Sequence, residues 1–127
     1  MRHFEAQRAE GRQQAALDFV WLLFHPPVPR IALENPVSII GSAIRKPDQI
    51  IQPWQFGHRE MTATCLWLKG LPPLVPTDIV GPPPVGRIES RSWEVVHRMP
   101  PGPDRWKARS RTCLGTAAAM AAQWSLT

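Results

Sequence analysis

The stretch RIALENPVSII, residues 30 to 40, joins a short apolar run to an acid, an amide and a proline. Residues 30 to 33 have the nearly continuous apolar character of a strand in a sheet that is buried on both faces. Because Pro36 has no amide hydrogen to donate, we expect this strand to cover residues 30–34 and to end at the Glu-Asn-Pro sequence. Glu34 and Asn35 then stand at a strand terminus, where open α/β sheets present side chains to a crevice.

The segment before this strand has the pattern of a helix. Its apolar residues recur at helical spacing with charged residues between them: Ala9, Ala16, Phe19, Val20 and Leu23. We therefore expect an amphipathic helix over residues 3–24, which the adjacent prolines of HPPVP, residues 25 to 29, bring to an end. A helix, a tight turn and a buried strand form the second half of a βαβ unit, so the expected fold class is α/β.

The middle of the chain alternates short ordered segments with loops. Residues 38 to 44 are expected to form a helical turn, and residues 45–61 a loop punctuated by prolines and a glycine. TATCLWLKGL, residues 62 to 71, has the pattern of a strand with Leu66 on one face and Trp67 on the other.

The last third of the chain is expected to be mostly irregular until its end. The proline-rich residues 72–92 have a composition that no regular element accommodates. Val95 to Met99 fits a last short strand. The alanine-rich residues 112–124 carry Leu114 and Met120 at helical spacing, which predicts a C-terminal helix.

Composition limits the class of protein. The chain has 127 residues, which suits one domain, and its 15 prolines and 8 glycines predict long irregular connections. Fifteen Lys and Arg against 10 Asp and Glu give a net charge of +5, and the isoelectric point is near 10.2. This balance favours a polyanionic partner, and nucleic acid is the first candidate.

Cysteine usage and hydropathy argue against several other classes. Cys65 and Cys113 stand apart, without a second cysteine or a histidine cluster at metal-ligand spacing, so neither a metal site nor a disulfide framework is expected. The longest apolar stretch, Phe19 to Phe24, is far shorter than the roughly 20 residues that span a bilayer. The N-terminus has no apolar core of a signal peptide, so we expect a cytoplasmic protein.

Three stretches carry a resemblance to a known family: RIALENPVSIIGSAIRKPDQIIQPWQFGH, ATCLWLKGLPPLVPT and HRMPPGPDRWKARSRTCLGTAAAMAAQW. They resemble the C-terminal half of the DNA cytosine-5 methyltransferase-like proteins of phages and prophages, with similarity from about residue 3 to residue 124. The resemblance implies that residues 1–127 form a single C-terminal fragment of a methyltransferase domain. Its fold would be a partial Rossmann-like methyltransferase fold, with C-terminal strands and helices only, and its cofactor S-adenosylmethionine.

The resemblance also implies a role for the end of the first strand. Glu34 and Asn35 match the Glu-Asn-Val motif of cytosine-5 methyltransferases, with Pro36 in the place of valine. In that family the glutamate hydrogen-bonds ring nitrogen 3 and the exocyclic amine of a cytosine that is flipped out of the duplex, and it assists addition at carbon 6. The residues alone also allow a structural role, in which Glu34 caps the following turn and Asn35 closes it.

Two parts of the family pattern are absent. The chain contains neither the glycine loop that follows the first strand of the family nor the Pro-Cys nucleophile, since Cys65 follows Thr64 and Cys113 follows Thr112. The last family motif, a Gly-Asn that opens a helix beside the cofactor, corresponds to Gly115 and Thr116, so cofactor binding by these residues is expected to be weak. We therefore expect the isolated chain to be inactive and to need a complementing N-terminal methyltransferase chain.

A basic cluster precedes the C-terminal helix. Its members surround one aromatic residue, Trp106: Arg98, Arg105, Lys107, Arg109 and Arg111. Such a cluster suits contacts to DNA phosphates, which position a protein without conferring sequence specificity, or it is simply a solvated charged face. Trp54, Trp67 and Trp106 are candidates for stacking on bases or for burial in the core.

The sequence therefore favours a DNA cytosine-5 methyltransferase-like protein that carries the base-recognition motif and is inactive alone. The alternative from another class is a non-enzymatic basic protein that binds nucleic acid or a partner chain through residues 98 to 111. A third is the inactive product of a disrupted gene.

Overall fold

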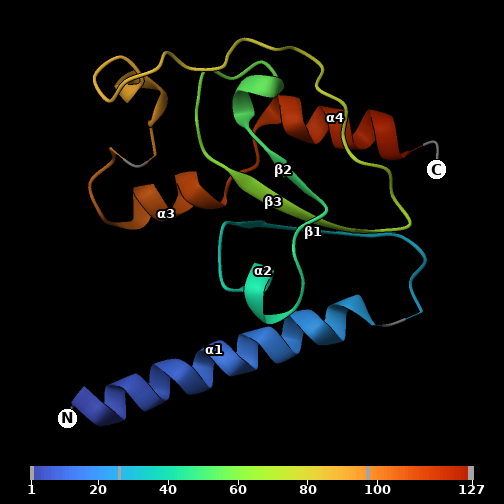
Figure 1. The fold of residues 1–127 in the computed structure, drawn as a ribbon, viewed down its shortest axis with the longest axis vertical. Coiled ribbons are helices and arrows are strands. Elements are labelled where there is room, and N and C mark those ends of the chain that lie inside the picture. Colours follow the sequence, from blue (N-terminus) through green and yellow to red (C-terminus); the bar gives the residue numbers. More distant parts are fainter. Residues whose placement is uncertain (1, 26, 97, 126–127) are drawn as a thin grey trace.

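The computed structural model describes residues 2–25, 27–96 and 98–125 (Figure 1). The described residues form a mixed α/β fold with a small three-stranded sheet, which confirms the expected class at that level. Two short 3-10 turns, Pro53–Gln55 and Arg91–Trp93, interrupt the connections. In chain order the helices and strands are α1 (Arg2–Phe24), β1 (Ile31–Pro36), α2 (Ile40–Ala43), β2 (Gln49–Ile51), β3 (Thr64–Lys69), α3 (Pro103–Ser110) and α4 (Leu114–Trp124).

The sheet has the order β1-β3-β2, and both outer strands pair antiparallel with β3. Because each is antiparallel to the same strand, β1 and β2 run in the same direction. β1 lies at the edge of the sheet and its residues alternate between half-buried and exposed, so the expectation of a strand buried on both faces is wrong. β1 also extends to Pro36, which pairs with Thr64 at the strand end, where a missing amide hydrogen is tolerated.

Strand β3 is the centre of the core. Leu66 and Trp67 are the largest fully buried side chains of the described residues, at 0% and 2% exposure, and they point to opposite faces of the sheet. The alternation expected for residues 62 to 71 is therefore confirmed. Around Leu66 pack Ile51, Phe56, Leu68, Leu74, Ala119, Met120 and Trp124. Around Trp67 pack Leu17, Val20, Phe24, Leu33, Ile40, Ile44 and Cys65.

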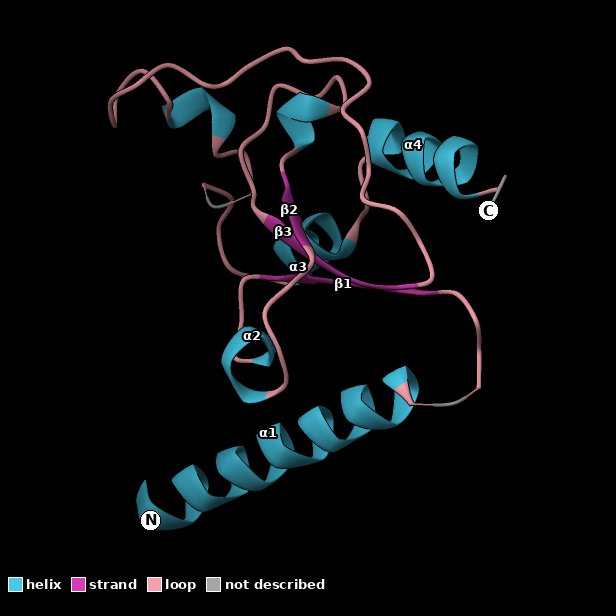
Figure 2. Cartoon of the chain, turned by 45° about the vertical axis from the view of Figure 1, so that its right-hand side comes forward, coloured by secondary structure: helices cyan, strands magenta, loops and turns pink. Residues whose placement is uncertain are grey.

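These two clusters divide the molecule into three layers. Helices α1 and α2 cover the Trp67 face of the sheet and α4 covers the Leu66 face (Figure 2). Helix α1 and the short helix α2 form where the sequence predicts them. The C-terminal helix starts at Leu114, two residues after its expected start.

The contact face of α1 differs from the expected one. Leu17, Val20 and Phe24 pack against the sheet layer, whereas Phe19 and Leu23 are 59% and 42% exposed. Leu22, at 68% exposure, joins these two on the outer side of the helix. The last turns of α1 are therefore apolar on two faces, and a single-faced amphipathic pattern describes them poorly.

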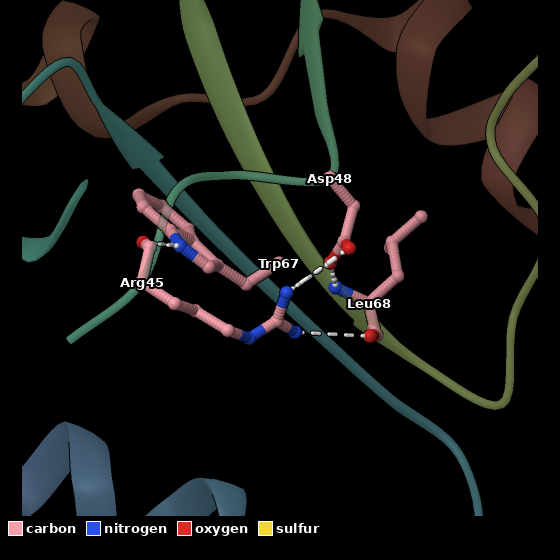
Figure 3. Close-up of polar contacts among 4 residues, drawn as sticks. All are labelled: Arg45, Asp48, Trp67 and Leu68. Atoms are coloured by element: carbon pink, nitrogen blue, oxygen red, sulfur yellow. Dashed lines mark hydrogen bonds and ion pairs between the residues drawn. The ribbon is translucent and has the colours of Figure 1, made fainter.

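Asp48 links the connection before β2 to the last residues of β3 (Figure 3). The Arg45 guanidinium donates hydrogen bonds to both carboxylate oxygens of Asp48, at 3.0 and 2.9 Å, and the Leu68 amide donates to one of them at 2.6 Å. Arg45 also donates to the Leu68 carbonyl, and its own carbonyl accepts from the Trp67 indole at 2.8 Å. The buried indole is thus satisfied by a segment that Asp48 holds in place.

Side-chain amides hold the proline-rich connection that follows β3. Gln49 exchanges two hydrogen bonds with the backbone of Leu74, at 2.7 and 2.8 Å, and Gln123 does the same with Val75, at 2.8 Å each. Of the expected irregular residues 72–92, residues 72 to 90 contain no helix or strand, whereas Arg91 and Ser92 begin a 3-10 turn. Leu74 and Val75 fix the first part of this connection against β2 and α4. The amides replace the strand neighbour that a proline-rich segment has too few amide hydrogens to recruit.

Three expectations about elements are wrong. Residues 45–61 contain strand β2, whose three residues are too few to show a periodic pattern. Val95 to Met99 is not a strand, because the amides of Arg98 and Met99 bond to carbonyls three or four residues earlier; residue 97 lies outside the described residues. Helix α3 was not expected, although Pro103 at its first position and Asp104 in its first turn are helix-start signals.

We predict that Leu66→Ala lowers the free energy of unfolding by about 2 to 5 kcal/mol, because the substitution leaves a cavity where the side chain is fully buried. Urea denaturation followed by tryptophan fluorescence measures this change. The matched control is Ile50→Ala in β2, where the side chain is 55% exposed and we expect a loss below about 1 kcal/mol. Similar losses for the two variants would show that the core is not centred on Leu66.

We predict a pH-dependent role for Asp48. Burial acts to raise the pKa of this carboxyl, but the hydrogen bonds from Arg45 and from the Leu68 amide and the charge of Arg45 outweigh it and lower the pKa below its ordinary 3.8. The ionised form therefore adds stability above pH 3.8, and this stability is lost as the pH falls through the folded-state pKa.

Asp48→Asn should cost about 1 kcal/mol at neutral pH, a small value because the side chain is 36% exposed and screened by solvent. The difference between Asp48→Asn and the natural protein should shrink below pH 4. Denaturant unfolding at a series of pH values measures it, and a difference that stays constant down to pH 2 would contradict the role of the ionised carboxylate.

Candidate functional site

A cavity of about 290 Å³ lies on the Leu66 face of the sheet, beside helix α4. We call it the Glu34 cavity; the residues of its sheet and α4 walls are Glu34, Pro36, Ile51, Thr64, Thr116 and Met120. β1 and β2 run in the same direction and both end here, while β3 begins here. The cavity thus lies where two strands end and the antiparallel central strand begins.

Strand geometry decides which side chain of the Glu-Asn pair enters this cavity. Glu34 is opposite Leu66 and Asn35 is opposite Cys65, so the two side chains point to opposite faces of β1. Glu34 lines the cavity, and among the described residues none makes a hydrogen bond or ion pair with its carboxylate.

Asn35 has a different environment. It lies on the Trp67 side of β1, and its amide donates a long hydrogen bond of 3.4 Å to the Ser38 hydroxyl, which also accepts from the Ile40 amide. Asn35 therefore takes part in the turn after β1, as the structural reading proposed. Glu34 makes no such contact within the described residues and remains turned toward the cavity.

The connection between α3 and α4 forms the opposite wall of the Glu34 cavity. Arg111, Thr112 and Cys113 line it, together with Ala108 from α3. Glu60 and Thr62, from the connection before β3, complete its polar surface. Carboxylates, hydroxyls and a guanidinium thus share one cavity with apolar side chains, the mixed lining that is common in small-molecule sites. Among the residues of this wall, the sequence predicts only Arg111 as a site residue. Glu60 and Thr62 belong to no recognisable motif, so the sequence gives no signal for them.

Of the two cysteines, Cys113 is the one that lines the Glu34 cavity. Burial raises the pKa of the Cys113 thiol, and the negative charge of Glu60 raises it further, against a smaller opposite effect of Arg111. The pKa of Cys65 is also raised, by burial in the core. Both residues are free thiols, and neither environment favours the thiolate that a cysteine nucleophile needs.

The start of α4 explains Gly115 by packing. Its amide donates a hydrogen bond to Nε2 of His58 at 2.9 Å, and a Cβ at this position would collide with the carbonyl oxygen of Phe56. Thr116, 6% exposed, is the member of the Gly-Thr pair that lines the Glu34 cavity. The Gly115 amide is thus engaged by His58, and weak cofactor binding by Gly115 and Thr116 stays a prediction.

The basic cluster is divided by the geometry of α3. Lys107 and Arg111 lie on one side of the helix with Asp104 and Ala108, and these four residues line a second hollow of about 340 Å³, which we call the α3 hollow. Trp106 lies on a different side of the helix and is 67% exposed. Lys107 and Arg111 therefore do not surround Trp106.

The remaining members of the cluster are also separated. Arg98 is exposed in the turn region before α3 and lines neither hollow. Arg105 is partly buried, and its Nε atom has no hydrogen-bond partner among the described residues. The side chain of Arg109 lies outside the described residues.

The three tryptophans proposed for base stacking have different environments. Trp67 is 2% exposed and packed in the core, so stacking on a base is ruled out for it. Trp54 is half-buried and packs against Gly81. Trp106 alone of the three has a largely exposed ring.

Two further properties concern ligands and membranes. Over the described part of the chain, no group of three or more His, Cys, Asp or Glu side chains is placed to hold a metal ion. None of the described helices combines the length and the apolar character needed to cross a bilayer.

Comparison of the chain with protein-family models, curated proteins and solved structures finds no match.

We predict that Gly115→Ala lowers the free energy of unfolding by about 1 to 3 kcal/mol, because the new methyl group overlaps the Phe56 backbone. The matched control is Gly11→Ala in α1, where no atom lies within 4 Å of the new group. This control should be neutral or stabilising by about 0.5 to 1 kcal/mol, since alanine is the better helix former. Equal stabilities of the two variants would show that α4 does not depend on the close approach of Gly115.

Proposed function

We propose that the chain is part of an S-adenosylmethionine-dependent DNA cytosine-5 methyltransferase of the phage and prophage type, and that it supplies the base-recognition carboxylate, Glu34. One observation carries the proposal: Glu34, Arg111 and Thr116, singled out in three separate stretches of sequence, line the same cavity. A cytoplasmic location and the partial Rossmann-like fold belong to the same proposal.

The position and size of the Glu34 cavity support this function. The Glu34 side chain lines the cavity near the end of β1, and its carboxylate has no partner among the described residues. The volume of about 290 Å³ is near the lower limit of small-molecule sites, so it suits a single base better than a large cofactor. Its walls combine hydrogen-bonding edges with apolar surface, as a flipped base requires.

The chemistry assigned to Glu34 follows from the structure of cytosine. In its protonated form the carboxyl donates a hydrogen bond to ring nitrogen 3, while its other oxygen accepts from the exocyclic amine. A proton placed on nitrogen 3 withdraws electrons from the ring, which favours addition of a nucleophile at carbon 6. Carbon 5 then becomes electron-rich enough to accept a methyl group.

The described residues do not complete an enzyme. Cys113 and Cys65 lie in environments that disfavour the thiolate, and Gly115 is engaged by His58. We therefore assign none of the described residues a step in methyl transfer from S-adenosylmethionine. We propose that a complementing N-terminal methyltransferase chain supplies the cofactor site and the nucleophile.

Two unpartnered surfaces are suited to such a second chain. β1 is an edge strand, and no backbone hydrogen bond to another described segment covers its outer side. A further strand added there, parallel to β1, would turn this antiparallel sheet into a mixed one. The exposed side of α1, with Phe19, Leu22 and Leu23, offers apolar area that the same chain can bury.

The second candidate function is a non-enzymatic protein that binds nucleic acid through its charge. The net charge of +5 and the pair of Lys107 and Arg111 in the α3 hollow favour it. This function has no need of a carboxylate in the Glu34 cavity. Removing the charge of Glu34 would then leave DNA binding unchanged or slightly stronger.

We predict that co-expression with an N-terminal methyltransferase half, which contains the cofactor loop and the Pro-Cys nucleophile, gives a soluble complex that methylates DNA. Glu34→Gln should lower its turnover by about 100-fold or more, the scale of a lost acid-base group, and leave cofactor binding intact. Transfer of a radiolabelled methyl group measures turnover, and calorimetry measures cofactor binding.

Glu89→Gln is the matched control, because Glu89 is an exposed glutamate outside the Glu34 cavity. The isolated chain, assayed in parallel, should show no methylation. An active complex that tolerates Glu34→Gln as well as Glu89→Gln would contradict the proposed role of Glu34.

A further inference from the structure

The outer side of β1 is an unpaired backbone edge. β1 pairs with β3 alone, and within the described residues no backbone hydrogen bond from another segment reaches its other side. An exposed strand edge is a template for pairing with another chain, and proteins usually cover or disrupt it. Pro36, the last residue of β1, lacks an amide hydrogen, but the residues before it have both backbone groups to offer.

Hydrogen bonds on the other side of β3 show which residues of β1 direct their backbone groups outward. The Leu66 carbonyl accepts from the Asp48 amide, and the Leu68 amide donates to the Asp48 carboxylate, in the connection before β2. Both leucines therefore direct their backbone groups away from β1, so the residues opposite them, Glu34 and Ala32, form ladder pairs without hydrogen bonds. The amides and carbonyls of Ala32 and Glu34 thus point to the open edge.

A second copy of the chain that pairs antiparallel with β1 must match these outward residues with one another. When Ala32 lies opposite the copy's Ala32, Arg30 of each chain lies opposite Glu34 of the other. Arg30 and Glu34 are both exposed, and among the described residues neither side chain makes a hydrogen bond or an ion pair. Residues 30, 32 and 34 share one face of the strand, so opposite charges meet on that face at both ends of the paired segment.

The neighbouring registers are worse. Centring the strand pair on Leu33 places Pro36, which has no amide hydrogen, opposite Arg30. Centring it on Glu34 opposes two carboxylates, which is destabilising. Centring it on Ile31 leaves both charged residues opposite neutral ones. Backbone groups and charges therefore select the same register, with Ala32 opposite itself.

We propose that the chain forms a two-fold symmetric dimer in which the β1 strands of two copies pair antiparallel, with Ala32 at the axis and Arg30 of each copy bonded to Glu34 of the other. The two three-stranded sheets then form one continuous sheet. This inference does not rest on the proposed function. A complementing N-terminal chain at the same edge would have to displace the second copy.

Helix α1 supplies apolar area for this dimer. The two-fold axis is perpendicular to the joined sheet, so both copies of α1 lie on its Trp67 face (Figure 2). α1 packs there in the same cluster as Leu33 of β1, which places it near the paired strands. Phe19 and Leu22, at 59% and 68% exposure, are apolar residues that contact between the two helices can bury. A standard interface buries roughly 800 Å² per partner, so a short strand pair gains from this added area.

Sedimentation equilibrium of the full chain over a range of concentrations tests the dimer, and charge reversal tests its register. Glu34→Arg places two arginines opposite each other at both ends of the paired segment and should weaken the dimer about tenfold. Combining Arg30→Glu with Glu34→Arg exchanges the charges and should restore the affinity of the natural protein. Glu89→Arg is the matched control, because Glu89 is exposed and lies outside β1, and it should leave the dimer unchanged.

Ala32→Pro tests the backbone pairing. It removes an amide hydrogen that points to the open edge and leaves the bonds between β1 and β3 in place, so the variant should fold and stay monomeric. A natural chain that is monomeric up to about 1 mM, or a dimer that neither Glu34→Arg nor Ala32→Pro weakens, would overturn the inference. A dimer that the exchanged charges fail to restore would overturn the pairing of Arg30 with Glu34. None of these measurements involves cytosine or methyl transfer, so their failure leaves the proposed function standing.

Discussion

The burial of Leu66 and Trp67 on opposite faces of β3 is the constraint on which the rest of the structure depends. Two adjacent large side chains with at most 2% exposure require cover on both faces, which α1 and α2 provide on one side and α4 on the other. The pairing of β1 with β3 then places Glu34 opposite Leu66, on the α4 side. A shift of this register by one residue would turn Glu34 to the α1 side and remove it from the cavity.

The start of α4 is packed against the connection that follows β2, next to the Glu34 cavity. Gly115 allows this close approach, since its amide reaches His58 and its Cα passes the Phe56 backbone. The residues just before it, Arg111 to Cys113, form the cavity wall. In this structure Gly115 serves packing, and Thr116 faces the cavity.

Local patterns predicted the elements whose own residues carry the signal. The alternation through Leu66 and Trp67 predicts β3, and alanine-rich helical spacing predicts α4. Three residues are too few to reveal β2, and the polar α3 has start signals but no apolar stripe. The edge position of β1 was not predictable, because it depends on pairing with residues that are 28 (Pro36 to Thr64) to 38 (Ile31 to Lys69) positions away. The convergence of Glu34, Arg111 and Thr116 on one cavity is a property of that pairing, and no stretch of sequence contains it.

The central claim is that the Glu34 carboxyl meets ring nitrogen 3 of a cytosine in the cavity beside α4. Its most direct test is the nitrogen-15 chemical shift of deoxycytidine 5′-monophosphate labelled at ring nitrogen 3 and bound to the full chain. We expect binding to move this shift toward its value in protonated cytosine and Glu34→Gln to reduce the change greatly. A bound nucleotide whose nitrogen 3 shift equals that of the free ligand would contradict this role of Glu34.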